Sequence, residues 1–249
     1  MSTRRWELLL PHEWVRMRKH VPVAYLPLGR LEWHGRHLPL GLDAVKAHAL
    51  CERMADRAGG IVMPPLFYGD DPTSVADLHF EDGQRISDAL AIDRMQYEAK
   101  TGPAGWEVYH GLLQSIFAEI ERVGFLVAVV VAGHYPLHDP ASKAAEEYMQ
   151  RGDLKILTCI GYDLVTDLGY RGDHAGKWET SLLMALCPGL VDLSRLEGEE
   201  EPPLGVSGDD PRDASVEFGE EAVRHIVERV YKEVGALLRE ANWPPAAGR

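Results

Sequence analysis

Carboxylates and imidazoles gather in one short, glycine-rich stretch of this chain. Residues 26–43 read LPLGRLEWHGRHLPLGLD and place Glu32, His34, His37 and Asp43 within twelve positions. These side chains are the usual ligands of zinc, manganese and iron. In an extended segment, side chains two apart share a face, so Glu32 and His34 can point at one spot, and glycines let the backbone return Asp43 towards them. A lone histidine on a loop is usually solvated surface, but this density predicts a metal or catalytic site.

A second polar group follows the strongest predicted strand. The run FLVAVVVA, residues 125–132, carries β-branched residues on both parities, which suits a strand covered on both faces. It leads directly into His134, and in open α/β sheets ligands collect at the carboxyl ends of strands. Glu32 follows the first predicted strand in the same way. Two strand ends would then present donors to one edge of the sheet; the alternative is a turn with merely exposed polar residues.

A third polar group stands at the start of a predicted helix. Residues 173–181 read DHAGKWETS, and the small residues after His174 allow close approach of another segment. Carboxylates and hydroxyls at a helix start are commonly caps without a catalytic duty. For Thr180 and Ser181 we therefore expect capping rather than chemistry.

The elements that must position these groups alternate between strands and helices. Predicted strands cover residues 21–28, 60–66, 125–132 and 154–160, and helix-period segments cover 43–57, 106–123, 140–150, 179–186 and 214–240. Such alternation favours a mostly parallel sheet with helices on both faces. The chain shows no internal repeat and no break in composition, so residues 1–249 are expected to form a single domain.

The composition argues against several classes of partner. The net charge of −13, from 39 acidic and 26 basic residues, makes a general affinity for nucleic acid or anionic membranes an unfavoured interpretation. No apolar run approaches the ~18 residues of a membrane helix, and Leu8–Leu10 is too short for a signal-peptide core. Cys51, Cys159 and Cys187 lack CxxC spacing and are expected to be buried and free. We expect a cytoplasmic protein.

Together these stretches resemble the creatininase (creatinine amidohydrolase) family, in the same order and over most of the chain. The family pattern EQHGxHLPLxxD resembles residues 32–43, and its Gly-His after the central strand resembles Gly133-His134. Its HAGxxETS block resembles residues 174–181, and its PPxxYG segment resembles residues 64–69. The first and third of these motifs are long and specific.

The resemblance implies a fold, a reaction and an assembly. The fold would be α/β, a three-layer α/β/α sandwich with a mostly parallel central sheet. The reaction would be metal-dependent amidohydrolysis, in which a metal-activated water cleaves a C–N bond of a small cyclic amide, lactam or formamide-type substrate. One or two divalent metals per chain (Zn, Mn or Fe) and a homohexamer are implied, with a small-molecule substrate and no nucleic-acid or membrane partner.

The resemblance also assigns metal ligands by matching position. Glu32, Asp43 and His134 would hold one metal, and His34 would share a second metal with Asp43 as the bridge.

Other positions carry catalytic and substrate-binding expectations. His174 would be the proton shuttle to the leaving nitrogen, a task suited to an imidazole. Glu179 would act as a further ligand or would orient the groups that bind the metal. Tyr68, Tyr135 and Trp178 are candidates for lining the substrate pocket, with core packing as the alternative for each.

One departure from the family pattern bears on the metal count. Creatininases proper carry a Glu two residues after the strand-end His, and Pro136 stands there in this chain. Creatinine is therefore an unfavoured substrate, and a second metal must recruit Glu179, His138 or Asp139, or else be weak or absent. Two alternatives to the hydrolase follow: a single-metal lyase or cyclisation enzyme of a specialised pathway, and a non-catalytic family scaffold.

Overall fold

The computed structural model describes residues 3–69, 94–198, 203 and 205–243, with side chains in the helix 94–122 described from residue 106 onward. Four strands, β1 (Val23–Leu28), β2 (Ile61–Val62), β3 (Val127–Ala132) and β4 (Lys155–Ile160), form a parallel sheet in the order β2-β1-β3-β4. The helices are α1 (Pro11–His20), α2 (Leu42–Ala58), α4 (Arg94–Arg122), α5 (His138–Met149), α6 (Lys177–Leu186) and α7 (Val216–Glu240). Short 3-10 turns cover Trp6–Leu8, Tyr135–Leu137, Asp163–Leu168, Pro188–Leu190, Leu193–Leu196 and Pro211–Asp213.

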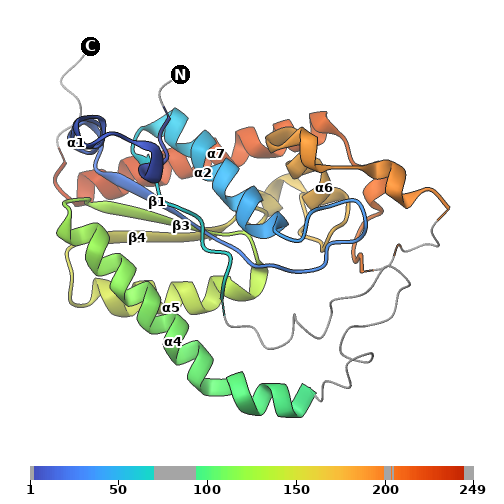
Figure 1. Cartoon of the computed structure of the whole chain (residues 1–249). Helices are drawn as coiled ribbons and strands as arrows, with labels where there is room; N and C mark the ends of the chain where they lie inside the picture. Colours follow the sequence, from blue (N-terminus) through green and yellow to red (C-terminus); the bar gives the residue numbers. More distant parts are fainter. Residues whose placement is uncertain (1–2, 70–93, 199–202, 204, 244–249) are drawn as a thin grey trace.

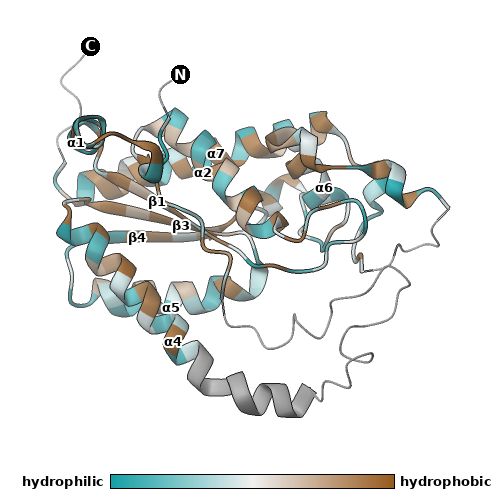
Figure 2. Cartoon of the chain, viewed as in Figure 1, coloured by the Kyte–Doolittle hydropathy of each residue, from teal (hydrophilic) through white to brown (hydrophobic). Residues whose placement is uncertain are grey.

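The sheet is the middle of three layers (Figure 1). Strand residues of one parity, such as Tyr25 and Val129, pack with α2, α6 and α7, and those of the other parity, such as Leu26 and Val130, pack with α4 and α5. Every residue of β1 and β3 is buried, as a strand covered on both faces requires. Figure 2 shows the strands as largely hydrophobic and the helices with mixed faces. The predicted α/β/α sandwich is confirmed.

The predicted strands and helices are largely confirmed, with differences at their ends. Strand β2 has only two residues, because Pro64 and Pro65 offer no N–H to the ladder, and pairing resumes only as one bridge at Leu66. Helix α4 begins at Arg94, twelve residues before the apolar periodicity, even though Gly102-Pro103 indicates a break. Helix α5 begins at His138 rather than Pro140.

The sequence pattern does not predict helix α1. It carries no buried residue, so it shows no full apolar stripe to reveal it. Its start has a signal nonetheless: Pro11 is at the first turn, and the Glu13 carboxylate accepts a hydrogen bond from the backbone N–H of Leu10. Among the described residues, none of the helices is both long and apolar enough to cross a membrane.

Glu121 ties the end of α4 to the turn before β4. Its carboxylate accepts hydrogen bonds from the backbone N–H groups of Asp153 at 2.5 Å and Leu154 at 3.0 Å, and from the Tyr148 hydroxyl at 2.5 Å. Desolvation opposes ionisation, but these donors lower the pKa of Glu121 below its ordinary value. Its stabilising contribution is therefore present above the ordinary glutamate pKa and is lost as the pH falls through the lowered one.

Glu121→Ala is expected to lower the free energy of unfolding at neutral pH by about 1 kcal/mol, after allowance for solvent screening of this partly buried group. Urea denaturation measures the change, and the deficit should shrink in acid. The matched control is Glu119→Ala, since the exposed Glu119 carboxylate pairs with Arg122 alone among the described side chains. Equal midpoints for the two variants at neutral pH would contradict the assigned role of Glu121.

Candidate metal centre

Two strand ends and one helix start converge at the site. Leu28 at the end of β1 lies opposite Ala132 at the end of β3, so the segments after them leave the same edge of the sheet. Gly29 and Gly133 follow these ends, and a Cβ atom on either would lie 2.0–2.1 Å from the backbone of the first turn of α2. This close approach seats Asp43, the second residue of α2, between the two strand ends.

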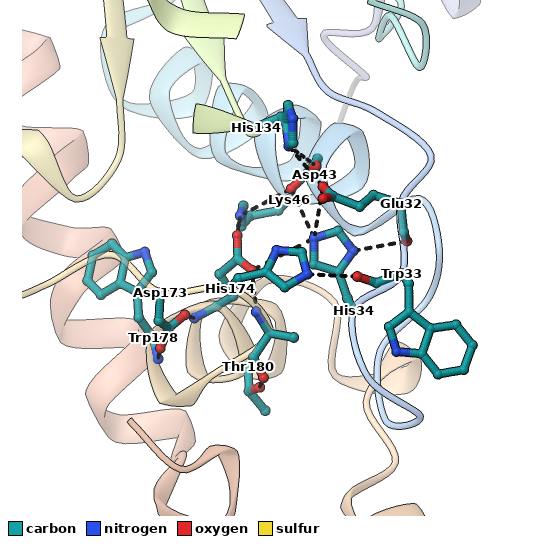
Figure 3. Close-up of polar contacts among 12 residues, drawn as sticks. Glu32, Trp33, His34, Asp43, Lys46, His134, Asp173, His174, Trp178 and Thr180 are labelled. Atoms are coloured by element: carbon teal, nitrogen blue, oxygen red, sulfur yellow. Dashed lines mark hydrogen bonds and ion pairs between the residues drawn. The ribbon is translucent and has the colours of Figure 1, made fainter. Parts of the chain in front are cut away.

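Glu32, Asp43 and His134 form one buried cluster (Figure 3). The distance from His134 Nδ1 is 2.9 Å to Glu32 Oε2 and 3.1 Å to Asp43 Oδ2. The three residues each offer a ligand atom within 4.8 Å of the others, a spacing that can hold a metal ion. The family resemblance assigns these three residues to one metal, and the fold brings them together.

His34 lies beside this cluster with one nitrogen free to bind. Its Nδ1 donates a hydrogen bond to the backbone carbonyl of Glu32 at 3.1 Å, which leaves the lone pair on Nε2. His34 Nε2 lies 3.4 Å from Asp43 Oδ1 and 3.8 Å from Glu179 Oε2, and these three residues form a second candidate cluster. Burial opposes protonation of His34, but the surrounding carboxylates, Asp43 above all, raise its pKa above the ordinary value.

Three of the possible ligand atoms are buried and left without a well-formed hydrogen bond among the described residues. These atoms are Glu32 Oε2, His34 Nε2 and Asp43 Oδ2. Buried polar atoms are usually paired, and an unpaired group calls for an explanation. Oxygen and imidazole nitrogen atoms converging on one point are the donor set that zinc or manganese takes. The residues present therefore fit a divalent metal.

Lys46 is the site residue that the sequence analysis missed. It is 7% exposed, its ammonium is hydrogen-bonded to Glu179 Oε1, and it lies 3.7 Å from Asp43 Oδ1. Burial alone would lower the pKa of Lys46, but the carboxylates of Glu179 and Asp43 raise it. A signal was available, because Lys46 stands three residues after Asp43 and four before Leu50, on the buried face of α2.

His174 stacks on His34, with ring centroids 4.5 Å apart. Its Nε2 donates a hydrogen bond to the backbone carbonyl of Trp33 at 2.8 Å, which leaves Nδ1 as the acceptor of the ring. The fold therefore brings the predicted proton shuttle to the predicted ligands. Together with Glu32 and His34, His174 forms a third cluster of possible metal ligands.

The expectation that Thr180 and Ser181 cap α6 is wrong. The Asp173 carboxylate caps the helix, accepting hydrogen bonds from two backbone N–H groups in its first turn at 2.7 and 3.2 Å. Both hydroxyls are buried: Thr180 Oγ1 pairs with His37 Nε2 at 3.0 Å, and Ser181 Oγ accepts from the backbone of Ser215 at 3.1 Å. The Asp173 carboxylate, which lies just before the helix, occupies the N–H groups that a cap would otherwise bind.

Two of these supporting groups have shifted pKa values. Desolvation, followed by the negative charge of Glu179, raises the pKa of Asp173 to about 7. Burial lowers the pKa of His37 to about 4, so this imidazole is neutral at neutral pH. His37 is thus a neutral side chain that pairs with Thr180 next to the site. Asp173 lines the cavity with a carboxyl whose pKa lies near neutral pH.

A cavity of about 240 Å³ opens onto the clustered residues. Tyr135 and Trp178, two of the three aromatic residues predicted for the pocket, line it. Tyr135 is 60% exposed and stacks on Tyr162, whereas Trp178 is buried and also packs against the core residue Tyr170. The third, Tyr68, is 77% exposed and is not among the described residues that line this cavity.

Of the three residues considered as further ligands of a second metal, one lies with the other candidate ligands and two do not. Glu179 is buried and belongs to the cluster with His34 and Asp43. His138 and Asp139 belong to none of the clusters found among the described residues, and they contact each other at 3.4 Å at the start of α5. Pro136 lines the cavity, and its side chain has no donor atom to offer a metal.

Comparison with known proteins gives one consistent result. The family model for creatinine amidohydrolase matches residues 11–234. The chain is 31% identical over 212 residues to a creatinine amidohydrolase from Pseudomonas putida, covering 76% of this chain and 75% of that protein. Two solved structures are each 25% identical to this chain: a mutant creatininase of Zn–Zn type, with a TM-score of 0.71, and a creatininase with Mn, with a TM-score of 0.70. Each comparison covers 98% of this chain and 100% of the solved chain.

Proposed function

The chain belongs to the creatininase family and is a hydrolase of carbon–nitrogen bonds other than peptide bonds; within that family, we propose that Glu32, Asp43 and His134 hold its divalent metal. The convergence of these three buried side chains from two strand ends and a helix carries the proposal. His34, whose Nε2 has no hydrogen-bond partner among the described residues, would share Asp43 with this ion at a second possible metal position. When bound, a divalent cation supplies Lewis acidity and makes water a usable nucleophile at neutral pH.

The chain's own residues account for orientation and proton movement. The hydrogen bonds from His34 and His174 to backbone carbonyls fix both rings, so that each keeps one nitrogen as an acceptor. We propose that His174 passes a proton to the leaving nitrogen, because it lines the cavity beside the metal ligands. Glu179 holds Lys46 and accepts a hydrogen bond from the backbone of Ala175, and thus orients the site.

The cavity favours a small substrate. Its volume of about 240 Å³ and its aromatic and aliphatic wall, which includes Tyr135, Tyr162 and Trp178, suit a small amide with little charge. A small cyclic amide, a lactam or a formamide-type compound meets these limits. Pro136 lies at the cavity where creatininases proper would present a carboxylate, so creatinine is the less favoured member of this class.

Metal removal should stop the reaction and destabilise the fold. Chelator-treated protein is expected to lose hydrolysis of small lactams and formamides, and reloading with Zn²⁺ or Mn²⁺ should restore it. A saturating metal should raise Tm by about 5–10 °C, because the ion binds only the folded state. NMR of the products and thermal melts measure the two effects. Hydrolysis that survives chelation would contradict the role of the metal, whereas no hydrolysis with any metal would favour the lyase or scaffold alternatives.

Three further proposals concern the whole molecule. We propose a homohexameric assembly, which the family resemblance implies. We also propose a single domain over residues 1–249 and a cytoplasmic location, both from the sequence patterns described above. The burial of the free cysteines Cys51 and Cys159 fits a reducing compartment. Light scattering on the purified chain would give the number of subunits directly.

A further inference from the structure

Lys46 lies where a second metal would need to bind. The candidate ligands of that second ion are His34, Asp43 and Glu179. The Lys46 ammonium contacts two of them. It is hydrogen-bonded to Glu179 Oε1, and it lies 3.7 Å from Asp43 Oδ1, beside which Figure 3 shows it. All four side chains are buried, so this lysine is a fixed part of the site and not a surface residue that reaches in.

Glu179 has both carboxylate oxygens already engaged. Oε1 accepts a hydrogen bond from Lys46, and Oε2 accepts one from the backbone N–H of Ala175 at 2.8 Å. Ala175 has a positive φ of 55°, an uncommon conformation for a residue with a Cβ atom. The backbone is thus held in a strained shape while its N–H points at Glu179. In contrast, Glu32 Oε2 and Asp43 Oδ2 lack well-formed hydrogen bonds among the described residues.

The charges of the site balance with one ion. The buried carboxylates Glu32, Asp43 and Glu179 carry three negative charges, which one divalent cation and the Lys46 ammonium neutralise together. With a second divalent ion, the two ions and the ammonium would exceed the charge of these three carboxylates by two positive charges, and buried charge without a partner is strongly unfavourable. Pro136, at the cavity wall, supplies no further carboxylate.

We propose that Lys46 replaces the second metal, so that the chain binds one divalent ion at Glu32, Asp43 and His134 and uses the ammonium as its second cation. This inference rests on the proposed function and adds to it a metal count and a positioning residue. Lys46 holds Glu179 and Asp43 in place and puts a positive charge at the cavity wall, where charge would otherwise come from a second ion.

Manganese binding to the full chain tests the count. Chelator-treated wild-type protein is titrated with Mn²⁺ by calorimetry, and its EPR spectrum distinguishes an isolated ion from an exchange-coupled pair. One equivalent with an isolated-ion spectrum is expected. Lys46→Met removes the ammonium at similar side-chain length and is expected to bind a second equivalent and give a coupled spectrum. The matched control is Lys177→Met at the start of α6, whose ammonium lies over the Phe218 ring, with one equivalent expected.

Several results would overturn the inference. Two equivalents in the wild type would refute the replacement of a metal by Lys46 while leaving the proposed hydrolysis intact. No binding at all would remove the metal on which both proposals depend. A single equivalent in folded Lys46→Met would show that the ammonium does not exclude a second ion. If circular dichroism shows that Lys46→Met is unfolded, Lys46→Gln keeps a donor for Glu179 without the charge and carries the same expectation.

Discussion

Asp43→Asn is expected to bind no divalent ion at the centre and to lose turnover by about 10³-fold or more, because a bound metal supplies several kcal/mol of transition-state stabilisation. Asp43 is 1% exposed and faces three partners in different directions, His134 at 3.1 Å, His34 at 3.4 Å and Lys46 at 3.7 Å. Against the effect of burial, the interactions with His34, His134 and Lys46 lower the pKa of Asp43 strongly. An asparagine keeps the shape but removes the charge that a divalent cation needs.

The matched control for this variant is Asp139→Asn. Asp139 is a second aspartate near the same strand end, but its side chain is 97% exposed and contacts only His138 among the contacts described. It should bind Mn²⁺ and turn over like the wild type. Calorimetry gives the metal affinity and product NMR gives the rate. Loss of metal by Asp139→Asn, or full activity of metal-free Asp43→Asn, would show that the metal site has been placed wrongly.

The layers and the donors of the site could be predicted because both depend on local patterns. Continuous β-branched runs mark a two-sided sheet, and donors just after Leu28 and Ala132 meet because the two strands are parallel and in register. The beginning of α4 at Arg94 could not be predicted in this way, because apolar periodicity starts only near Trp106. Such a boundary is set by tertiary context, which a local pattern does not contain.

The role of Lys46 could not be settled from the sequence either. A lysine on a helix is normally solvated, and only the packing of α6 against α2 brings Glu179 to its ammonium across 133 positions. The cap of α6 illustrates the same limit. Asp173, Thr180 and Ser181 all carry capping groups near the helix start, and the backbone path between residues 173 and 177 decides which of them is used.

Gly133→Ala should disrupt the centre by moving backbone, without removing any ligand. A Cβ atom at this position would lie 2.0 Å from the backbone carbonyl oxygen of Asp43, so either the end of β3 or the start of α2 must shift. Overpacking against backbone cannot be relieved by a rotamer change, and we expect the free energy of unfolding to fall by about 3 kcal/mol. The shift also separates Asp43 from His134, so Mn²⁺ affinity should fall by about 10–100-fold, as when the support of a ligand is lost.

The matched control carries the opposite expectation. Gly111 lies within α4, and a Cβ atom there would meet nothing within 4 Å, so Gly111→Ala should raise stability by about 0.5–1 kcal/mol through helix propensity and leave Mn²⁺ affinity unchanged. Urea denaturation and Mn²⁺ calorimetry on both variants separate a steric effect at the site from a general effect of alanine. If Gly133→Ala matched the wild type in both measurements, contact between the end of β3 and the start of α2 could not be what positions Asp43 beside His134.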